Sequence, residues 1–372
     1  MLVLDESRLA LNIDLTYNAA PHFWAVEPRA VRIDIVVFEV SAVNQVFALA
    51  ILVALALLLD ILTGIFSAPS ITATIVASRV MALRTALFLA TIAELIGPFL
   101  FGLAVANTVA SEVVDARVIT LPILYAALIG AIIWTLICWY ARIPSSVSHA
   151  QIGGMIGAAV VALGAQSLQR DGLIKILLAL TVTVPLSFIF SFILVRVSYF
   201  LTQNATPRVN RRFNQGQTLA SFTLGLAIGS NSAQRTMGII ALGLVITGFL
   251  PQFEIPTWVI AISALGLALG NLLGGRLIRT VGAKFFQLRS VHGFSVEAAT
   301  STIVIITSLL GGPISTTQLT SMAVVGAGSA ERLSMVRWGF VQNILLTWVL
   351  TIPMTGLVSA LVYLTLSQLG VR

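Results

Sequence analysis

Charged residues are scarce in this chain of 372 residues, of which only 9% are Asp, Glu, Lys or Arg. Hydrophobic residues make up 58%, and the mean hydropathy of +1.01 lies far above the range of soluble globular proteins. Several apolar runs, such as residues 87–110 and 118–141, reach the roughly 20 residues that cross a bilayer core. The composition therefore excludes an ordinary soluble domain and predicts a polytopic protein of the cell membrane.

Cysteine and histidine are also nearly absent. Cys138 is the only cysteine, so an intramolecular disulfide is excluded and a thiolate metal site is not expected. The histidines, His22, His149 and His292, are too far apart in sequence to suggest a metal site. We therefore predict no metal and no cofactor. We also predict no enzymatic activity, because no nucleophile, base and orienting group form a recognisable pattern.

The few charges show how the chain crosses the membrane. The formal net charge is +7, but the basic residues are spread over short loops, which fits positive-inside topology better than nucleic-acid binding. The densest group is Arg208, Arg211 and Arg212, which we place in the cytoplasm. Counting spans from there predicts that loops 79–84, 142, 276–289 and 332–337 lie inside. Loops 111–117, 166–175 and 251–256 are predicted outside.

A polar segment of small residues lies between two long apolar runs, at residues 229–238, with the sequence GSNSAQRTMG. A fainter copy occurs 165 residues earlier, at residues 64–72, with the sequence GIFSAPSIT. Polar groups at membrane depth are unfavourable unless they line a cavity or pack inside the bundle. Two such segments in matching places are typical of a transporter's binding site, formed by interrupted helices or re-entrant hairpins.

A second pair of motifs agrees with the first. PSSVSH at residues 144–149 follows an inside turn, and PISTTQ at residues 313–318 follows an outside one, so the two halves are oppositely oriented. We predict an all-α integral membrane protein with about 10–12 transmembrane segments in two inverted-topology repeats. The predicted parts are a polar segment 1–39, a first repeat 40–202, a basic cytoplasmic linker 203–216 and a second repeat 217–372. Segment 1–39 is either a surface segment or an upstream extension.

Each Pro-Ser/Thr motif predicts a helix start, because proline is favoured in the first turn and Ser or Thr can cap free N–H groups. Such a terminus is a natural anion site. The hydroxyls that could surround a tetrahedral oxyanion are Ser145, Ser146, Ser148, Ser315, Thr316 and Thr317. The alternative is that these side chains merely cap and pack transmembrane helices.

Arg235 follows Ser232 by one helical turn, so the two can share a helix face. An arginine in an apolar stretch costs roughly 2.5–3.5 kcal/mol, which predicts an anionic partner. That partner is either the substrate or a carboxylate such as Glu94 or Glu297. The alternative is a snorkelling or ion-paired structural arginine. Glu94, Glu297 and His149 are candidates for ion coupling, with structural pairing or packing as the rival interpretation.

These residues resemble the inorganic phosphate transporter (PiT) family over about residues 60–366. Residues 229–242 are similar to the family's G-[AS]-N-D-A-Q-K-T-M-G-I-I-A-L. Residues 142–154 are similar to its L-P-S-S-S-S-H-A-L-I-G-G, and residues 312–317 to its L-P-V-S-T-T-H. The resemblance implies a carrier that works by alternating access.

The departures from the family pattern are specific. Ser67 and Ser232 stand where the family has an aspartate in each repeat, and the family members that use sodium place those carboxylates around the ion. Thr63 and Ser70 replace asparagines, and Gln318 replaces a histidine. The resemblance therefore implies an anion carrier whose coupling cation, sodium or proton, is open.

We expect a secondary transporter for inorganic phosphate in the lipid bilayer, with homo-oligomerisation left open. The alternatives are a sulfate permease of the same family and, in another class, a membrane scaffold or sensor without transport. Sulfate is fully deprotonated and needs only donors, which neutral hydroxyls supply. The expected anion-binding residues outside the two Pro-Ser/Thr motifs are Ser67, Ser70, Asn231, Ser232 and Arg235.

Overall fold

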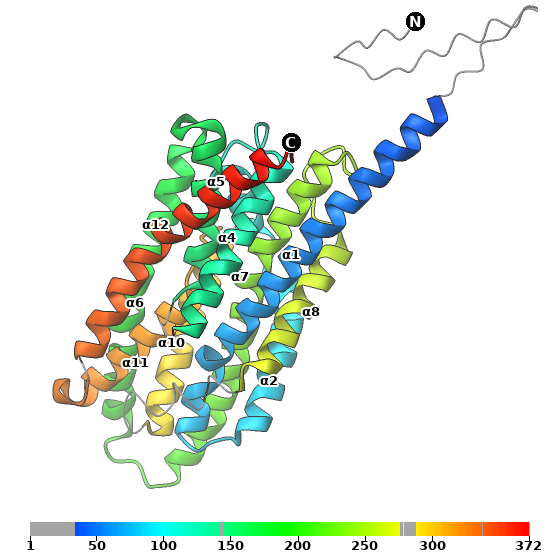
Figure 1. Cartoon of the computed structure of the whole chain (residues 1–372). Helices are drawn as coiled ribbons and strands as arrows, with labels where there is room; N and C mark the ends of the chain where they lie inside the picture. The colour runs from blue at the N-terminus through cyan, green and yellow to red at the C-terminus, as the bar shows by residue number, and fades with distance from the viewer. Residues whose placement is uncertain (1–33, 142–144, 276–277, 279–287, 337, 372) are drawn as a thin grey trace, which may run out of the picture. The chain divides into compact units, whose positions relative to one another are not determined.

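The computed structural model describes residues 34–141, 145–275, 278, 288–336 and 338–371. Pro144 and most of the predicted segment 1–39 and of loop 276–289 lie outside the described residues. The chain divides into a unit Met1–Val43 and a unit Asn44–Arg372, and the second holds the whole candidate site. The helices are α1 (Asp34–Ala77), α2 (Leu83–Ile96), α3 (Ala104–Asn107), α4 (Leu121–Tyr140), α5 (Val147–Leu163), α6 (Arg170–Thr202), α7 (Val209–Ile246), α8 (Thr257–Leu273), α10 (Ser290–Leu309), α11 (Thr316–Glu331) and α12 (Trp338–Gln368) (Figure 1).

Within the described ranges the chain is helical, and its only β contact is an isolated bridge between Val114 and Leu168. Four helical stretches are long and apolar enough to cross a membrane: Val43–Ala77, Leu121–Tyr140, Arg170–Thr202 and Leu345–Gln368. The prediction of an all-α multi-pass membrane protein is confirmed. The apolar helices α5 and α8 are shorter, and the polar segment of α7 lowers the hydropathy of an otherwise long helix.

One interruption of the predicted kind is present. Leu83–Phe99 and Ala104–Glu112 together are apolar enough for a fifth span, but they are bent by 69° at the break between them. The second piece consists of α3 and a π-helical turn, η2 (Thr108–Glu112). A π-helical turn inside a helix often marks a functional site. The predicted span 87–110 is therefore a broken helix.

The interruptions predicted at residues 64–72 and 229–238 are wrong, because α1 and α7 continue through both segments. The glycines there allow close helix packing instead. A Cβ added to Gly64 would lie 2.1 Å from the carbonyl oxygen of Leu267 in α8, and one added to Gly229 would lie 2.7 Å from the Cα of Glu94 in α2. Small residues let backbones approach in this way where lipid gives no hydrophobic drive.

The helices of the two predicted repeats pack across each other. In the first half, α5 packs against its neighbour α4 and against α12 at the end of the chain. In the second half, α11 packs against α10 and against α6. The Gly64 and Gly229 contacts add the pairs α1 with α8 and α7 with α2. Each half therefore completes its packing with helices of the other.

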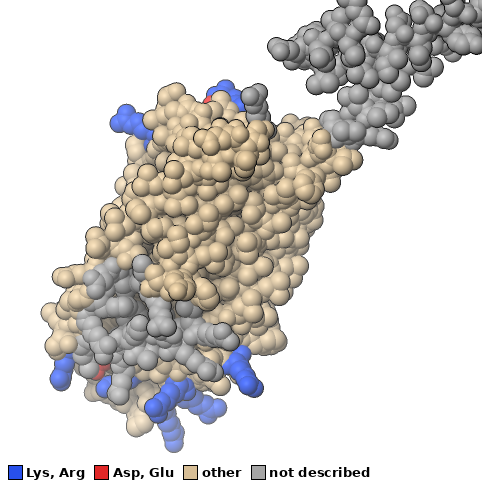
Figure 2. All heavy atoms as spheres, viewed as in Figure 1, with Lys and Arg blue, Asp and Glu red and all other residues tan. Residues whose placement is uncertain are grey.

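Charged side chains avoid the middle of the protein surface. Figure 2 shows Lys and Arg at two ends of the face in view, with the visible described surface between them almost free of charge. Large apolar side chains are exposed instead, for example Val349, Leu361 and Phe88, which are 73%, 65% and 63% accessible. An exposed apolar surface of this extent requires a lipid environment.

Candidate functional site

Arg235 lies at the centre of the candidate site, in the middle of α7. The residue is only 1% exposed. Its Nε donates to Gln151 Oε1 at 3.2 Å, and its Nη1 donates to Asn231 Oδ1 and to the carbonyl oxygen of Ile314, each at 3.3 Å. All three acceptors are neutral, so no carboxylate in the described part of the chain is hydrogen-bonded to this cation. The guanidinium can therefore also bind an anion, and its shape suits phosphate oxygens.

Asn231, one turn before Arg235, connects α7 to the turn between α10 and α11. Its Nδ2 donates to Ser308 Oγ at 2.8 Å and to the carbonyl oxygen of Gly312 at 3.2 Å. Its Oδ1 also accepts from the backbone N–H of Ile314 at 3.3 Å. Both ends of the amide are thus used, which fixes the approach to α11 beside the guanidinium.

The two predicted helix starts are present, but they are capped differently. Ser146 is the N-cap of α5, and its Oγ accepts from the backbone N–H of His149 at 3.2 Å, so the predicted cap is confirmed. Ser315 occupies the N-cap position of α11 but makes no capping bond, and its Oγ lies 3.3 Å from Thr317 Oγ1. The side chain of Ser315 therefore leaves the first N–H groups of α11 uncapped.

The remaining hydroxyls of the two motifs lie close to these starts. Ser145 Oγ lies 3.1 Å from Thr351 Oγ1 of α12. Ser148 is buried in the first turn of α5, Thr316 is buried in that of α11, and Thr317 is half-buried. They line the helix starts without reaching Arg235 through a hydrogen bond.

The two starts meet across the protein. Gln318 Nε2 of α11 lies 3.0 Å from His149 Nδ1 of α5. Arg235 makes a second link, since it bonds to Gln151 in α5 and to Ile314 just before α11. Motifs that are 169 residues apart in sequence therefore surround one buried cation.

The serines of the first polar segment lie elsewhere. Ser67 Oγ donates to Glu94 Oε1 at 2.6 Å and contacts the carbonyl oxygen of Gly64 at 3.0 Å. Ser70 is buried in the next turn of α1. Neither makes a hydrogen bond to Arg235 in the described part of the chain. Ser232, by contrast, adjoins Asn231, and its buried Oγ has no hydrogen-bond partner among the described residues.

Of the two partners suggested for Arg235, the substrate or a carboxylate such as Glu94 or Glu297, the named carboxylates are bonded elsewhere. Glu94 is bonded to Ser67, and Glu297 accepts from Thr74 Oγ1 and from Gln217 Nε2, so neither is paired with the guanidinium. The carboxylate that interacts electrostatically with Arg235 is Asp60 of α1, which is fully buried. A carboxylate inside the first apolar span was the available sequence signal, because intramembrane charges are functional candidates by default.

Gln151 and Ser308 were also missed. Gln151 follows the Ser-rich motif by three residues, so its position next to a helix start was the signal. No sequence signal pointed to Ser308, because many Ser and Thr residues in the chain bond to the carbonyl four residues earlier.

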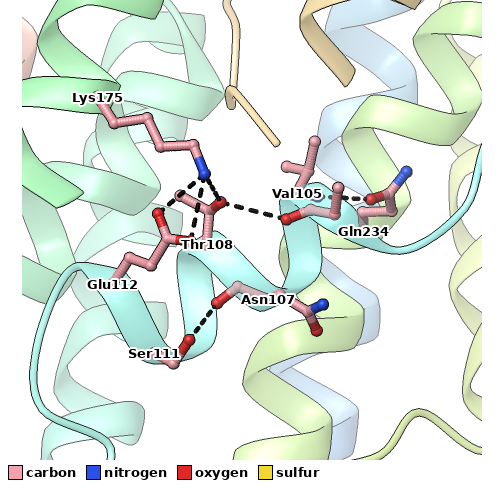
Figure 3. Close-up of polar contacts among 8 residues, drawn as sticks. Val105, Asn107, Thr108, Ser111, Glu112, Lys175 and Gln234 are labelled. Carbon is pink, nitrogen blue, oxygen red and sulfur yellow. Dashed lines mark hydrogen bonds and ion pairs between the residues drawn. The ribbon is translucent and has the colours of Figure 1, made fainter. Parts of the chain in front are cut away.

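A polar group on the far side of the α10–α11 turn supports the site (Figure 3). Lys175 Nζ, from α6, lies 2.9 Å from Glu112 Oε2 and donates to Thr108 Oγ1 at 2.9 Å, both in η2. A Cβ on Gly311, whose φ is +75°, would be 3.0 Å from Lys175 Nζ. This turn thus lies between η2 and Asn231.

Figure 3 also shows Gln234, whose Oε1 accepts from the backbone N–H of Val105 at 2.9 Å. This bond satisfies a donor in the first turn of α3, where helices have unpaired N–H groups. Neighbouring residues of this polar segment therefore make contacts with different parts of the protein. Gln234 fixes the broken span, while Asn231 and Arg235 bind the start of α11.

Comparison with known proteins gives consistent matches. A model described as "Phosphate transporter family" matches residues 63–359. A probable low-affinity inorganic phosphate transporter of Rhizobium meliloti is 38% identical over 315 residues, which cover 84% of this chain and 94% of the relative. The protein of the same description from Bacillus subtilis is 33% identical over 324 residues, covering 86% and 97%.

A solved structure agrees with these matches. The structure titled "The sodium-dependent phosphate transporter" superimposes with a TM-score of 0.78 at 25% identity, covering 87% of this chain and 99% of that chain. The likeness extends over almost the whole of the solved chain, so the two proteins share one helical fold.

Proposed function

The chain belongs to the phosphate transporter family, and on that basis we propose that it carries inorganic phosphate across the cell membrane by alternating access. Relatives described as inorganic phosphate transporters, at 38% and 33% identity, support the substrate. The family is one of transporters, so the protein is not an enzyme.

The observation that carries this proposal is the bonding of Arg235 to neutral acceptors at two opposed helix starts. A phosphate ion in this place would meet a guanidinium, the free N–H groups of α11 and the hydroxyls of Ser315 and Thr316. Together these donors suit an oxyanion, and burial strengthens each interaction. The anion-binding residues expected from the sequence are proposed on this basis.

Arg235 is 1% exposed, so this conformation is closed at the site and transport requires opening toward each side in turn. We propose two inverted repeats, 40–202 and 217–372, joined by linker 203–216. The reciprocal packing of α5 with α12 and of α11 with α6 supports this division. Rocking one half against the other would expose Arg235 to either side without breaking the helices.

The coupling cation belongs to the same proposal. The solved structure is titled as sodium-dependent, whereas Ser67 and Ser232 replace two aspartates of the family pattern in this chain. Sodium or a proton would then be held by other groups. Glu94, Glu297 and His149, all buried within the helices, are the candidates that the sequence alone suggests.

Uptake of radiolabelled phosphate into proteoliposomes tests the function. We expect uptake to be driven by a sodium gradient or an inward proton gradient and to persist with excess unlabelled sulfate. Arg235→Met should lower the rate about 100-fold, because the anion loses hydrogen bonds to a charged group. Arg235→Lys keeps the charge without the planar fork and should lose only about tenfold.

Arg196→Met is the matched control, since Arg196 is an exposed arginine of α6 that lies over the Phe192 ring. Its uptake should equal that of the wild type. The function is refuted if no gradient drives phosphate into vesicles that contain folded wild-type protein. The site is refuted if Arg235→Met transports at the control rate.

A further inference from the structure

Asp60 is a buried carboxylate that has no role in binding the anion as described above. It lies in α1, in the middle of the apolar span, and it is 0% exposed. Neither Oδ1 nor Oδ2 has a hydrogen-bond partner among the described residues. A carboxylate that is buried without partners is strongly unfavourable unless a cation compensates it. Arg235 attracts it without a hydrogen bond, so the carboxylate oxygens remain open to a ligand.

Oxygen atoms from two further helices surround it (Figure 1 shows α1, α7 and α8). Thr236 of α7 and Ser263 of α8 lie beside the Asp60 carboxylate without a hydrogen bond to it. Ser263 is 0% exposed, and its Oγ has no hydrogen-bond partner in the described part of the chain. Gly266 lets α8 approach, since a Cβ there would lie 2.9 Å from the Cβ of Asp60. Three buried side chains from three helices thus direct hard oxygen donors to one place.

The nearby charge connects this place to the anion site. Arg235 precedes Thr236 in α7 and attracts Asp60 electrostatically, but its hydrogen bonds go to Gln151, Asn231 and Ile314. One guanidinium therefore serves both Asp60 and the incoming anion. An anion at Arg235 would offset the charge that stabilises Asp60, and the carboxylate would then favour a cation of its own.

In the described part of the chain, Arg235 is the charged group that interacts with Asp60. The α8 sequence contains no Asp, Glu, Lys, Arg or His. In α4 the nearest titratable group described is Tyr125, which bonds to the carbonyl oxygen of Ala48, about three turns away along α1. Glu94 of α2 is held by Ser67.

We propose that Asp60, Thr236 and Ser263 form the site of the coupling cation, a proton or a sodium ion, whose binding is linked through Arg235 to that of the anion. The inference rests on the proposed function, because it needs an anion at Arg235. Linkage is reciprocal, so cation binding at Asp60 strengthens anion binding by the same factor. Either ion adds one positive charge at the carboxylate, the proton by bonding to an Asp60 oxygen and the sodium ion by coordination to the surrounding oxygens.

The test compares two modes of transport in proteoliposomes. Accumulation is the uptake of labelled phosphate driven by a sodium gradient or by a proton gradient. Exchange is the entry of labelled phosphate against unlabelled phosphate inside, with equal sodium and pH on both sides. We expect Asp60→Asn to keep exchange and to lose gradient-driven accumulation, since only the coupling cation is lost. The gradient that drives the wild type identifies the cation.

A second variant removes one donor and leaves the carboxylate. Ser263→Ala should shift the cation concentration for half-maximal accumulation by about threefold. The half-saturating phosphate concentration in exchange should be unchanged when the cation is saturating on both sides, because linkage then no longer lowers anion affinity. Ser191→Ala is its matched control, because Ser191 of α6 is a buried serine whose Oγ likewise has no partner among the described residues. The control should behave as the wild type.

The outcomes separate the two hypotheses. Wild-type protein that neither exchanges nor accumulates phosphate refutes the proposed function itself. Exchange by the wild type together with full accumulation by Asp60→Asn refutes the cation site alone. If Asp60→Asn is inactive in both modes, the result for Ser263→Ala decides whether the cation site is correct. An unchanged cation concentration for half-maximal accumulation by Ser263→Ala overturns the proposal. Titration of Asp115 does not affect the proton-gradient measurement. Hydrogen bonds from Arg117 lower the pKa of Asp115 to about 2, so this carboxylate stays ionised.

Discussion

Asn231 and Arg235 lie one helical turn apart in α7, and each bonds to residues that are more than 70 positions away in sequence. Their spacing is visible in the sequence, and so is their depth in the membrane. The partners are not, because periodicity tells which residues share a helix face but not which helix that face meets. For this reason the sequence could offer Glu94 and Glu297 only as examples of a carboxylate partner for Arg235, whereas Asp60 is the carboxylate that interacts with it.

The amide of Asn231 gives a prediction at this scale. Asn231→Ala would leave the backbone N–H of Ile314 and the carbonyl oxygen of Gly312 without their partner. Unsatisfied buried groups cost about 1–3 kcal/mol each, so we expect a lower melting temperature in detergent and a loss of phosphate uptake. A thermal-shift assay and the vesicle assay measure the two effects.

Asn204, which is exposed between α6 and α7, supplies the control. Asn204→Ala should change neither the melting temperature nor uptake. Equal melting temperatures for the two variants would mean that the bonds of Asn231 do not hold the α10–α11 turn.

The helix α1 shows what local signals miss at the scale of an element. The polar segment 64–72, which contains Gly64 and Pro69, predicted a break, yet α1 continues to Ala77. Glycine and proline have several roles, and the choice between a break and a close contact depends on the helix opposite, here Leu267 of α8. The start of α5 at Ser146, by contrast, could be predicted from the sequence. A helix cap depends only on residues within the first turn, so no contact with another helix is needed to predict it.

The close contact of α1 with α8 can be tested by adding one methyl group. Gly64→Ala would place its Cβ 2.1 Å from a backbone oxygen, which no rotamer change can relieve. The helices must separate, so we expect a loss of stability of about 1–3 kcal/mol. Thermal unfolding followed by size-exclusion chromatography measures it.

Gly339 of α12 is the matched glycine, since it is exposed and an added Cβ there meets no atom within 4 Å. Gly339→Ala should be neutral or slightly stabilising, because alanine is the better helix former. A stability of Gly64→Ala equal to that of Gly339→Ala would contradict the packing.

At the scale of the whole molecule, the sequence yields the membrane class, the helical architecture and the direction of each crossing from a few charges. The first two are confirmed, and the direction remains a prediction. The division into repeats was suggested by paired motifs, and the reciprocal packing of α5 and α11 supports it. The exact partners in that packing could not be predicted, because lipid-facing and helix-facing apolar residues look alike in sequence.

The crossing direction can be measured with single cysteines. Cys138 is fully buried, so Cys138→Ser gives a background without thiols. In that background Arg211→Cys should react with a membrane-impermeant thiol reagent only from the cytoplasm. Arg117→Cys, at a side chain that is 88% exposed, should react only from outside.

Labelling of both positions from the same side would refute the predicted topology. Labelling of Arg211→Cys from outside and of Arg117→Cys from inside would show that the whole chain is inverted. In that case the two positions would still lie on opposite sides of the membrane, as the structure requires.

The reciprocal packing of the two halves also has a consequence for biosynthesis. During synthesis, α1 and α2 enter the membrane well before α7 and α8 have been made. Asp60 and Glu94 are therefore in the membrane before the helices that later enclose them. A translation product truncated before α7 would expose these carboxyl groups to hydrocarbon and keep Gly64 without its neighbour. Each time this protein is made, the insertion machinery and membrane quality control therefore encounter a first half with unburied polar groups. These groups become buried only when the chain is complete.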